Sequence, residues 1–216
     1  MIKKIETLKK ITDVGVVAVV RAENDDMAEK ISKACLEGGI SAIEVTFTVP
    51  NADKVISSLK EKFDEEELVV GAGTVLDSET ARIAILAGAA YIVSPGFDLE
   101  TAKLCNRYQI PYMAGCMTIT EVIKAMEAGV DVVKLFPGSA YGPSIVKDIK
   151  APLPQAPIMP TGGVSLENVH EWINNGCIAV GVGGKLIEGA KTGNYELVTE
   201  TAKAFVEKVK AVRAAK

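Results

Sequence analysis

The chain has 216 residues, of which 48% are hydrophobic and 5% aromatic, and its formal net charge is −4. This length fits one domain, over residues 1–216, whose core needs no disulfide or metal to hold it. The acidic balance argues against a nucleic-acid partner, which would require a basic face. Four widely spaced cysteines without a C-x-x-C pair are typical of reduced thiols in a cytoplasmic protein. No apolar run approaches the roughly 18 residues of a membrane span, and the N-terminus is typical of an amphipathic helix, so we expect no secretion signal and no membrane partner.

Apolar, strand-like runs alternate with amphipathic, helix-like runs along the whole chain. The expected strands are Gly15–Arg21, Ile40–Phe47, Leu68–Thr74, Tyr91–Pro95, Tyr112–Gly115, Val132–Phe136, Ile158–Thr161 and Ile178–Val182. Most are nearly continuous runs of Val, Ile and Ala, as in parallel strands that are buried on both faces. The predicted fold is an α/β (β/α)8 TIM barrel with an N-terminal helix. The alternative is an open, doubly wound sheet, which usually has fewer strands.

The ends of the helix-like runs support this alternation. Four glycines each follow such a run and precede a strand: Gly38, Gly88, Gly129 and Gly176. We expect each to occupy the helix C′ position, where glycine takes a positive φ at no steric cost. Thr118 and Ser165 stand directly before two of these helix-like runs and are expected to be their N-caps.

Two charged residues fall on strand faces that should point into the barrel. In DVVKLFP, Val133 and Leu135 would pack on the helices, which turns Lys134 inward, and the same alternation in SAIEVTFT turns Glu44 inward. Buried charges are costly, so the two side chains form either a structural ion pair or a functional one. In the functional interpretation, desolvation favours the neutral amine, which can attack a ketone, and the glutamate is a general acid/base. The sequence pattern alone leaves both the structural and the functional interpretation open.

Glycine-rich segments follow the seventh and eighth expected strands. They are Pro160-Thr161-Gly162-Gly163-Val164 and Gly181-Val182-Gly183-Gly184. Loops at these two places usually form the phosphate site of a (β/α)8 barrel, because backbone N–H groups converge there. We therefore predict a phosphate site. Arg21 and Thr74 end the first and third expected strands and should lie at the same rim of the barrel.

The chain has few residues that could support other catalytic mechanisms. The only histidine, His170, falls in the middle of a helix-like run, so neither a zinc site nor a Ser–His–Asp triad can be built around it. G-V-G-G near the end of the chain lacks the context of a dinucleotide fingerprint. We expect no metal and no cofactor.

The runs VVAVVRA, IEVTFTVPNA, VGAGTV, YIVSPGFD, YMAGCMTITE, VVKLFPG, MPTGGVSLENV and AVGVGG resemble, in order and over nearly the whole chain, the 2-keto-3-deoxy-6-phosphogluconate (KDPG) aldolases. Some members also act on 4-hydroxy-2-oxoglutarate. The resemblance implies a homotrimeric class I aldolase that reversibly cleaves KDPG to pyruvate and glyceraldehyde 3-phosphate. It implies that Lys134 is the Schiff-base lysine and that Glu44 is the general acid/base, working through a water. The resemblance assigns the binding residues as well: Thr74 to the pyruvyl carboxylate, Pro95, Phe136 and Thr161 to the wall around the pyruvyl methyl group, and Gly162, Gly163, Gly183 and Gly184 to the phosphate.

Two positions depart from this family. Many members have an arginine that binds the carboxylate where this chain has Thr48, and we take Arg21 as the hypothetical replacement for its charge. Many also have a serine on the phosphate where this chain has Gly184, which leaves the phosphate to backbone donors and Lys185. Two rival functions use the same barrel: a phosphosugar isomerase or epimerase, and a non-catalytic phosphometabolite-binding scaffold. Neither needs the inward pair of lysine and glutamate.

Overall fold

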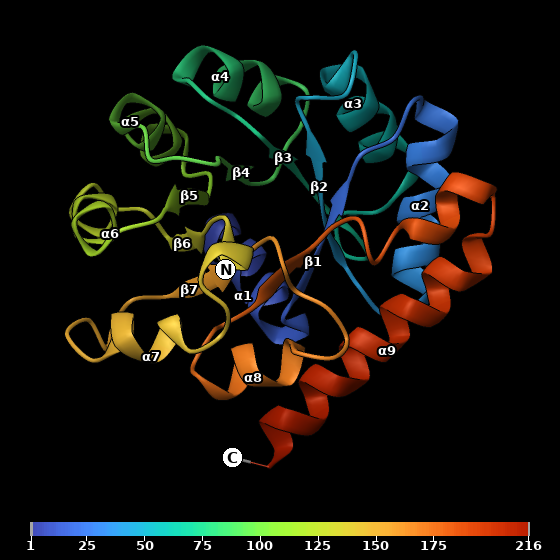
Figure 1. Cartoon of the computed structure of the whole chain (residues 1–216). Coiled ribbons are helices and arrows are strands. Elements are labelled where there is room, and N and C mark those ends of the chain that lie inside the picture. The colour runs from blue at the N-terminus through green and yellow to red at the C-terminus, as the bar shows by residue number, and fades with distance from the viewer. Residues whose placement is uncertain (1, 216) are drawn as a thin grey trace.

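The computed structural model describes residues 2–215, so Met1 and Lys216, the two ends of the expected domain, lie outside the described residues. Eight parallel strands form one sheet in the order β7-β6-β5-β4-β3-β2-β1-β8. Helices surround this sheet on the outside (Figure 1). The sheet closes where Thr161 bridges to Gly181 and where the Ile178 N–H donates to the Ile158 carbonyl at 3.0 Å. The predicted (β/α)8 TIM barrel is confirmed, and the open doubly wound sheet is ruled out.

The strands are β1 (Val16–Val20), β2 (Ala42–Thr46), β3 (Val69–Gly73), β4 (Ile92–Val93), β5 (Tyr112–Cys116), β6 (Val132–Leu135), β7 (Ile158–Pro160) and β8 (Val180–Val182). Every end lies within two residues of its expected position. One end of each of β2, β4 and β8 differs by two residues, and β4, which we expected to reach Pro95, stops at Val93. Proline has no N–H to donate to a neighbouring strand, so the ladder stops earlier.

The α-helices are α1 (Lys3–Val14), α2 (Asp25–Glu37), α3 (Ala52–Lys62), α4 (Ser78–Leu86), α5 (Leu99–Tyr108), α6 (Ile119–Glu127), α7 (Ile145–Lys150), α8 (Val169–Asn174) and α9 (Tyr195–Ala214). Two short 3-10 helices, η1 (Gly138–Ala140) and η2 (Glu188–Thr192), follow β6 and β8. The N-terminal α1 does not belong to the outer ring. Its Leu8 and Ile11 pack into the barrel interior, and its ribbon lies across the centre of the barrel in Figure 1.

Strand residues divide between two apolar cores according to the alternation expected from the sequence. The outer core lies between strands and helices and contains Ile43, Val45, Val133 and Leu135. The inner core fills the barrel and includes Val17, Ala42, Val69, Tyr91, Val93, Met113, Val132 and Met159. A residue that follows this inward phase is therefore held inside the barrel, as the sequence pattern predicted for Lys134 and Glu44.

Three of the four expected helix-ending glycines, Gly88, Gly129 and Gly176, have positive φ. The prediction for Gly38 was wrong: its φ is −78°, and Gly39 takes the positive φ of 90°. Gly38 serves a different purpose, because a Cβ there would lie 2.4 Å from the Cβ of Ala202, on α9. The missing side chain lets α9 pack closely on α2, a contact visible at the right of Figure 1.

The two N-cap predictions had different outcomes. Thr118 caps α6 in a reciprocal capping box with Glu121. Ser165 does not cap α8, which begins at Val169 with Asn168 before it. The Asn168 side chain accepts the Ser165 N–H and donates to the Gly163 carbonyl, so this segment forms a turn that ties the helix to the loop after β7.

Candidate active site

Lys134 and Glu44 meet inside the barrel. Lys134 comes from β6 and Glu44 from β2, and their residues are 4% and 2% exposed. The Lys134 Nζ lies 3.7 Å from the Glu44 Oε1 and 5.1 Å from the centre of the Phe136 ring. Among the described residues these two are the buried charged side chains. The distance is longer than a normal hydrogen bond, so the two groups form an ion pair without a direct hydrogen bond.

Two inward-facing glycines make space for this pair. A Cβ on Gly73 would lie 2.8 Å from the Glu44 Oε1 and 3.0 Å from its Cδ. A Cβ on Gly115, the register partner of Lys134, would lie 2.0 Å from the Pro95 carbonyl oxygen. The first glycine admits the Glu44 carboxyl, and the second lets the Pro95 loop pass over β5 next to the lysine. The sequence analysis did not identify either glycine, since the contacts that require them lie between strands.

A pocket of about 430 Å³ opens at the carboxyl ends of the strands. It brings together most of the predicted site residues: Arg21, Phe136, Thr161, Gly162, Gly163, Gly183, Gly184 and Lys185. Val19, Val164, Ser165 and Gly181 complete its wall. The Gly138 N–H donates to the Thr161 carbonyl at 2.9 Å, which joins the loop after β6 to the end of β7. Two cationic side chains therefore share a pocket with two glycine-rich loops, an arrangement suited to an anion.

The remaining predicted residues, Thr48, Thr74 and Pro95, follow β2, β3 and β4 at the same end of the barrel, but do not line this pocket. Thr74 has a φ of 56°, an unusual conformation for a β-branched residue. Thr48 is exposed, and its Oγ1 lies 2.9 Å from the Oγ1 of Thr46, which is buried and faces inward.

A buried hydrogen-bond network positions the Pro95 loop. The Ser94 Oγ lies 2.6 Å from the Tyr112 hydroxyl and donates to the Gly96 carbonyl at 2.6 Å. The Asp98 N–H donates to the same Tyr112 hydroxyl at 3.3 Å. Burial raises the pKa of Tyr112 to about 12, so this phenol keeps its proton. In the sequence, the polar Ser94 beside Pro95 in an apolar run was the available signal for this network. The sequence could not show that its partner is Tyr112, on the next strand.

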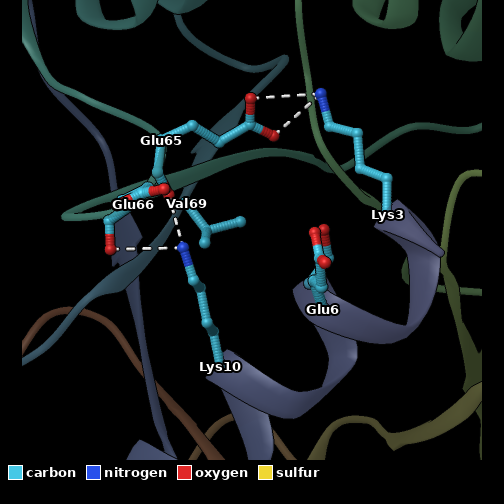
Figure 2. Close-up of a pocket in the computed structure, with 7 residues that line it drawn as sticks. Lys3, Glu6, Lys10, Glu65, Glu66 and Val69 are labelled. Carbon is cyan, nitrogen blue, oxygen red and sulfur yellow. Dashed lines mark hydrogen bonds and ion pairs between the residues drawn. The ribbon is translucent and has the colours of Figure 1, made fainter. Parts of the chain in front are cut away.

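A second pocket, of about 290 Å³, lies at the opposite end of the barrel between α1 and the start of β3 (Figure 2). Its cations are already engaged. Lys3 forms an ion pair with Glu65 at 3.0 Å, and Lys10 donates to the Glu65 and Glu66 carbonyls. These contacts are typical of a structural tie between α1 and the barrel, so this pocket is not the candidate active site.

Residues 2–215 contain no cluster of metal ligands and no membrane-spanning helix. No group of three or more His, Cys, Asp or Glu side chains there could hold a metal ion. No helix in the same range has both the length and the apolar character needed to cross a membrane.

Comparison with known proteins supports an aldolase site. The family model for KDPG and KHG aldolases matches residues 7–201. The chain belongs to this family. This aldolase is 32% identical over 197 residues to 2-dehydro-3-deoxy-6-phosphogalactonate aldolase of Escherichia coli, covering 91% of this chain and 95% of the relative. It is 33% identical to 2-dehydro-3-deoxy-phosphogluconate aldolase of Treponema pallidum, with 80% of each chain covered.

A solved structure of the same family shows the chemistry. KDPG aldolase from Legionella pneumophila, with pyruvate captured at low pH as a covalent carbinolamine intermediate, matches this aldolase with a TM-score of 0.82 and 29% identity. The match covers 88% of this chain and 93% of that chain. A carbinolamine requires an amine nucleophile, so the relatives bear out the prediction of a lyase of the Schiff-base type.

Proposed function

We propose that this protein cleaves a 2-keto-3-deoxy sugar acid phosphate to pyruvate and glyceraldehyde 3-phosphate, through a Schiff base on Lys134. One observation carries the proposal: the Lys134 amine is buried in the barrel, 3.7 Å from the Glu44 carboxylate, and sits beside a pocket suited to an anion. An isomerase or a scaffold would use the pocket but has no need of this pair.

In the proposed reaction the Lys134 Nζ adds to the C2 carbonyl carbon, and water leaves to give a protonated imine. The imine withdraws the electron pair of the C3–C4 bond while Glu44, through a water, takes the proton of the C4 hydroxyl. Glyceraldehyde 3-phosphate departs and leaves an enamine. The enamine takes a proton at C3, and water then hydrolyses the imine to pyruvate and the free lysine.

Several features of the structure support our assignment of the binding residues. We assign Thr74 to the pyruvyl carboxylate because its left-handed backbone costs free energy, and such strain persists where function requires it. Phe136, whose ring lies beside the lysine amine, forms the wall near the pyruvyl methyl group together with Pro95 and Thr161. The phosphate rests on the backbone of Gly162, Gly163, Gly183 and Gly184 and near Lys185.

The gluconate and galactonate compounds are epimers at C4. The relatives are named for both the galactonate and the gluconate compound, at 32% and 33% identity. We propose the gluconate compound, with 4-hydroxy-2-oxoglutarate as a second substrate. We also propose that Arg21, in the same pocket as the phosphate loops, supplies the charge that Thr48 lacks. The values of kcat/KM for the three substrates decide the first point, and Arg21→Ala with the preferred substrate decides the second.

We further propose that residues 1–216 act as one domain of a cytoplasmic homotrimer. Apolar side chains are exposed along one side of the barrel, on α4, α5, α6 and the adjoining loops: Leu76, Ile83, Leu86, Leu99, Tyr108, Met117, Ile119, Ile123 and Tyr141. The three helices are neighbours in Figure 1. A surface this apolar suits burial against other copies. The four cysteines are buried, as is typical of thiols in a reducing compartment. Sedimentation equilibrium measures the oligomeric state.

The deciding experiment is intact mass spectrometry after incubation with pyruvate and borohydride, followed by peptide mapping. Reduction of the imine fixes pyruvate to the amine that carried it. We expect one adduct, on Lys134. A folded sample that forms no adduct, or forms it on another lysine, would contradict the proposal. Release of glyceraldehyde 3-phosphate from the gluconate compound then identifies the second product.

A further inference from the structure

Tyr91 buries a hydroxyl group in the middle of the barrel. It lies just before β4, belongs to the inner apolar core and is 0% exposed. Among the described residues, its hydroxyl oxygen is one of two buried side-chain polar atoms with no hydrogen-bond partner, and the other is the indole nitrogen of Trp172. Buried hydroxyl groups in folded proteins almost always have a partner, so the surroundings of this one need an explanation.

The hydroxyl end of the Tyr91 ring lies directly over Gly71. A Cβ on that glycine would be 2.4 Å from the ring Cζ and 2.5 Å from both Cε atoms. Gly71 is the register partner of Glu44, and Gly73, the next inward position of β3, is the residue whose Cβ would meet the Glu44 carboxyl. The phenol therefore occupies the inward layer next to the Glu44 carboxylate, on the side away from the open end of the barrel.

One of the two buried charged side chains is a hydrogen-bond acceptor for this phenol. Burial, and then the negative charge of Glu44, raise the pKa of Tyr91 well above its ordinary value, so the hydroxyl keeps its proton. The buried charged side chains of the described residues are Glu44, on β2, and Lys134, on β6. Of these only the carboxylate accepts a hydrogen bond.

The proposed reaction gives such a donor a use. The nitrogen of Lys134 is in turn a free amine, a protonated imine and a neutral enamine, so the charge facing Glu44 appears and disappears within each turnover. A neutral hydroxyl donor on the other side of the carboxylate does not change during these steps. It can keep the carboxylate oriented toward the substrate when the lysine no longer attracts it.

We propose that Tyr91 is a positioning residue for Glu44: its hydroxyl donates a hydrogen bond to the carboxylate, through one buried water or after a small rotation of the carboxylate. The inference rests on the proposed function of Glu44 in proton transfer. A buried water needs two or more polar partners, and the phenol and the carboxylate supply them.

The first test is Tyr91→Phe, which removes the hydroxyl and keeps the ring. The readout is the exchange of pyruvate methyl hydrogens in D₂O, followed by proton NMR, because this exchange requires proton transfer at C3 of the enamine and needs no aldehyde. We expect the exchange rate to fall about ten- to a hundredfold, the effect of losing a hydrogen bond to a charged group. Borohydride trapping of pyruvate on Lys134 and the KM for pyruvate should stay within about twofold of the parent. Tyr195→Phe, at a half-buried tyrosine of α9 that does not line the candidate active-site pocket, is the matched control.

The second test asks whether Tyr91 acts through Glu44. In a Glu44→Gln background, Tyr91→Phe should lower the exchange rate by less than about twofold, because the carboxylate it positions is gone. Equal losses in both backgrounds would show that Tyr91 supports the fold alone and would overturn the inference. The inference would also be overturned if Tyr91→Phe kept the exchange rate of the parent and had a higher Tm. That result would mean that the removed hydroxyl had no partner. A parent protein that traps no pyruvate would instead refute the aldolase reaction itself, so the two failures are distinguishable.

Discussion

Gly73→Ala tests whether the exact place of the Glu44 carboxylate matters. Gly73 ends β3 and faces inward, and its φ is not in the left-handed region, so alanine fits the backbone. The added Cβ would lie 2.8 Å from the Glu44 Oε1, about 0.6 Å closer than the 3.4 Å at which ordinary contact begins. Either the carboxylate or the strand must move by about that amount.

The carboxylate should move, because it is the end of a side chain and the strand is held by neighbours on both sides. A displacement of about 1 Å at a catalytic group can cost about a hundredfold in rate. For about 0.6 Å we expect kcat to fall about tenfold or somewhat more. The free energy of unfolding should fall by about 1–3 kcal/mol, as in other overpacked cores.

The assay measures pyruvate release by coupling it to lactate dehydrogenase, with urea unfolding of the same samples. The three atoms nearest to the added Cβ all belong to Glu44, so borohydride trapping of pyruvate on Lys134 should remain at the level of the parent. Gly96→Ala is the control, because no atom lies within 4 Å of its added Cβ. A folded Gly73→Ala protein with parental kcat would refute the argument that this glycine positions Glu44.

Four further changes have expected outcomes. Lys134→Arg keeps a cation but no nucleophilic amine, so turnover should fall at least about a thousandfold and the borohydride adduct should disappear from the mass spectrum; a surviving adduct contradicts the role. Glu44→Gln should slow cleavage about 10²–10⁴-fold and spare imine trapping, and equal losses in both steps would count against proton transfer. Gly184→Ser adds its side chain into free space and should lower the KM for the phosphorylated substrate about tenfold, whereas an unchanged KM would place the phosphate elsewhere. Asp77→Ala removes the N-cap of α4 and should cost about 1 kcal/mol in urea unfolding at pH 7. The backbone N–H of Thr80 lowers the pKa of Asp77, so this contribution is present above about pH 4 and is lost as the pH falls through the folded-state pKa; a difference in stability that does not shrink as the pH is lowered below about 4 would contradict it.

The sequence by itself determined the architecture and the inward direction of the two central side chains. Period-two alternation assigns each strand residue to the barrel interior or to the helices, and this placed Lys134 and Glu44 inside before their distance was known. The glycine-rich loops follow the seventh and eighth strands in the chain. Because parallel strands all end at the same rim, both loops could be assigned to one phosphate site. These features are local, since each depends on a few consecutive residues and on the order of the elements.

Only the tertiary structure decided what lies between strands. Three contacts depend on strand register and on close approach between strands. Gly73 makes room for Glu44, Gly71 lies under Tyr91, and Tyr112 supports the loop of Pro95. The same reason explains the error at Gly38, a position set by the packing of α9 on α2 rather than by the end of its own helix. Neighbours on different strands or helices are tens of residues apart in the chain, and no periodicity within one segment encodes which atoms they bring within 3 Å of each other.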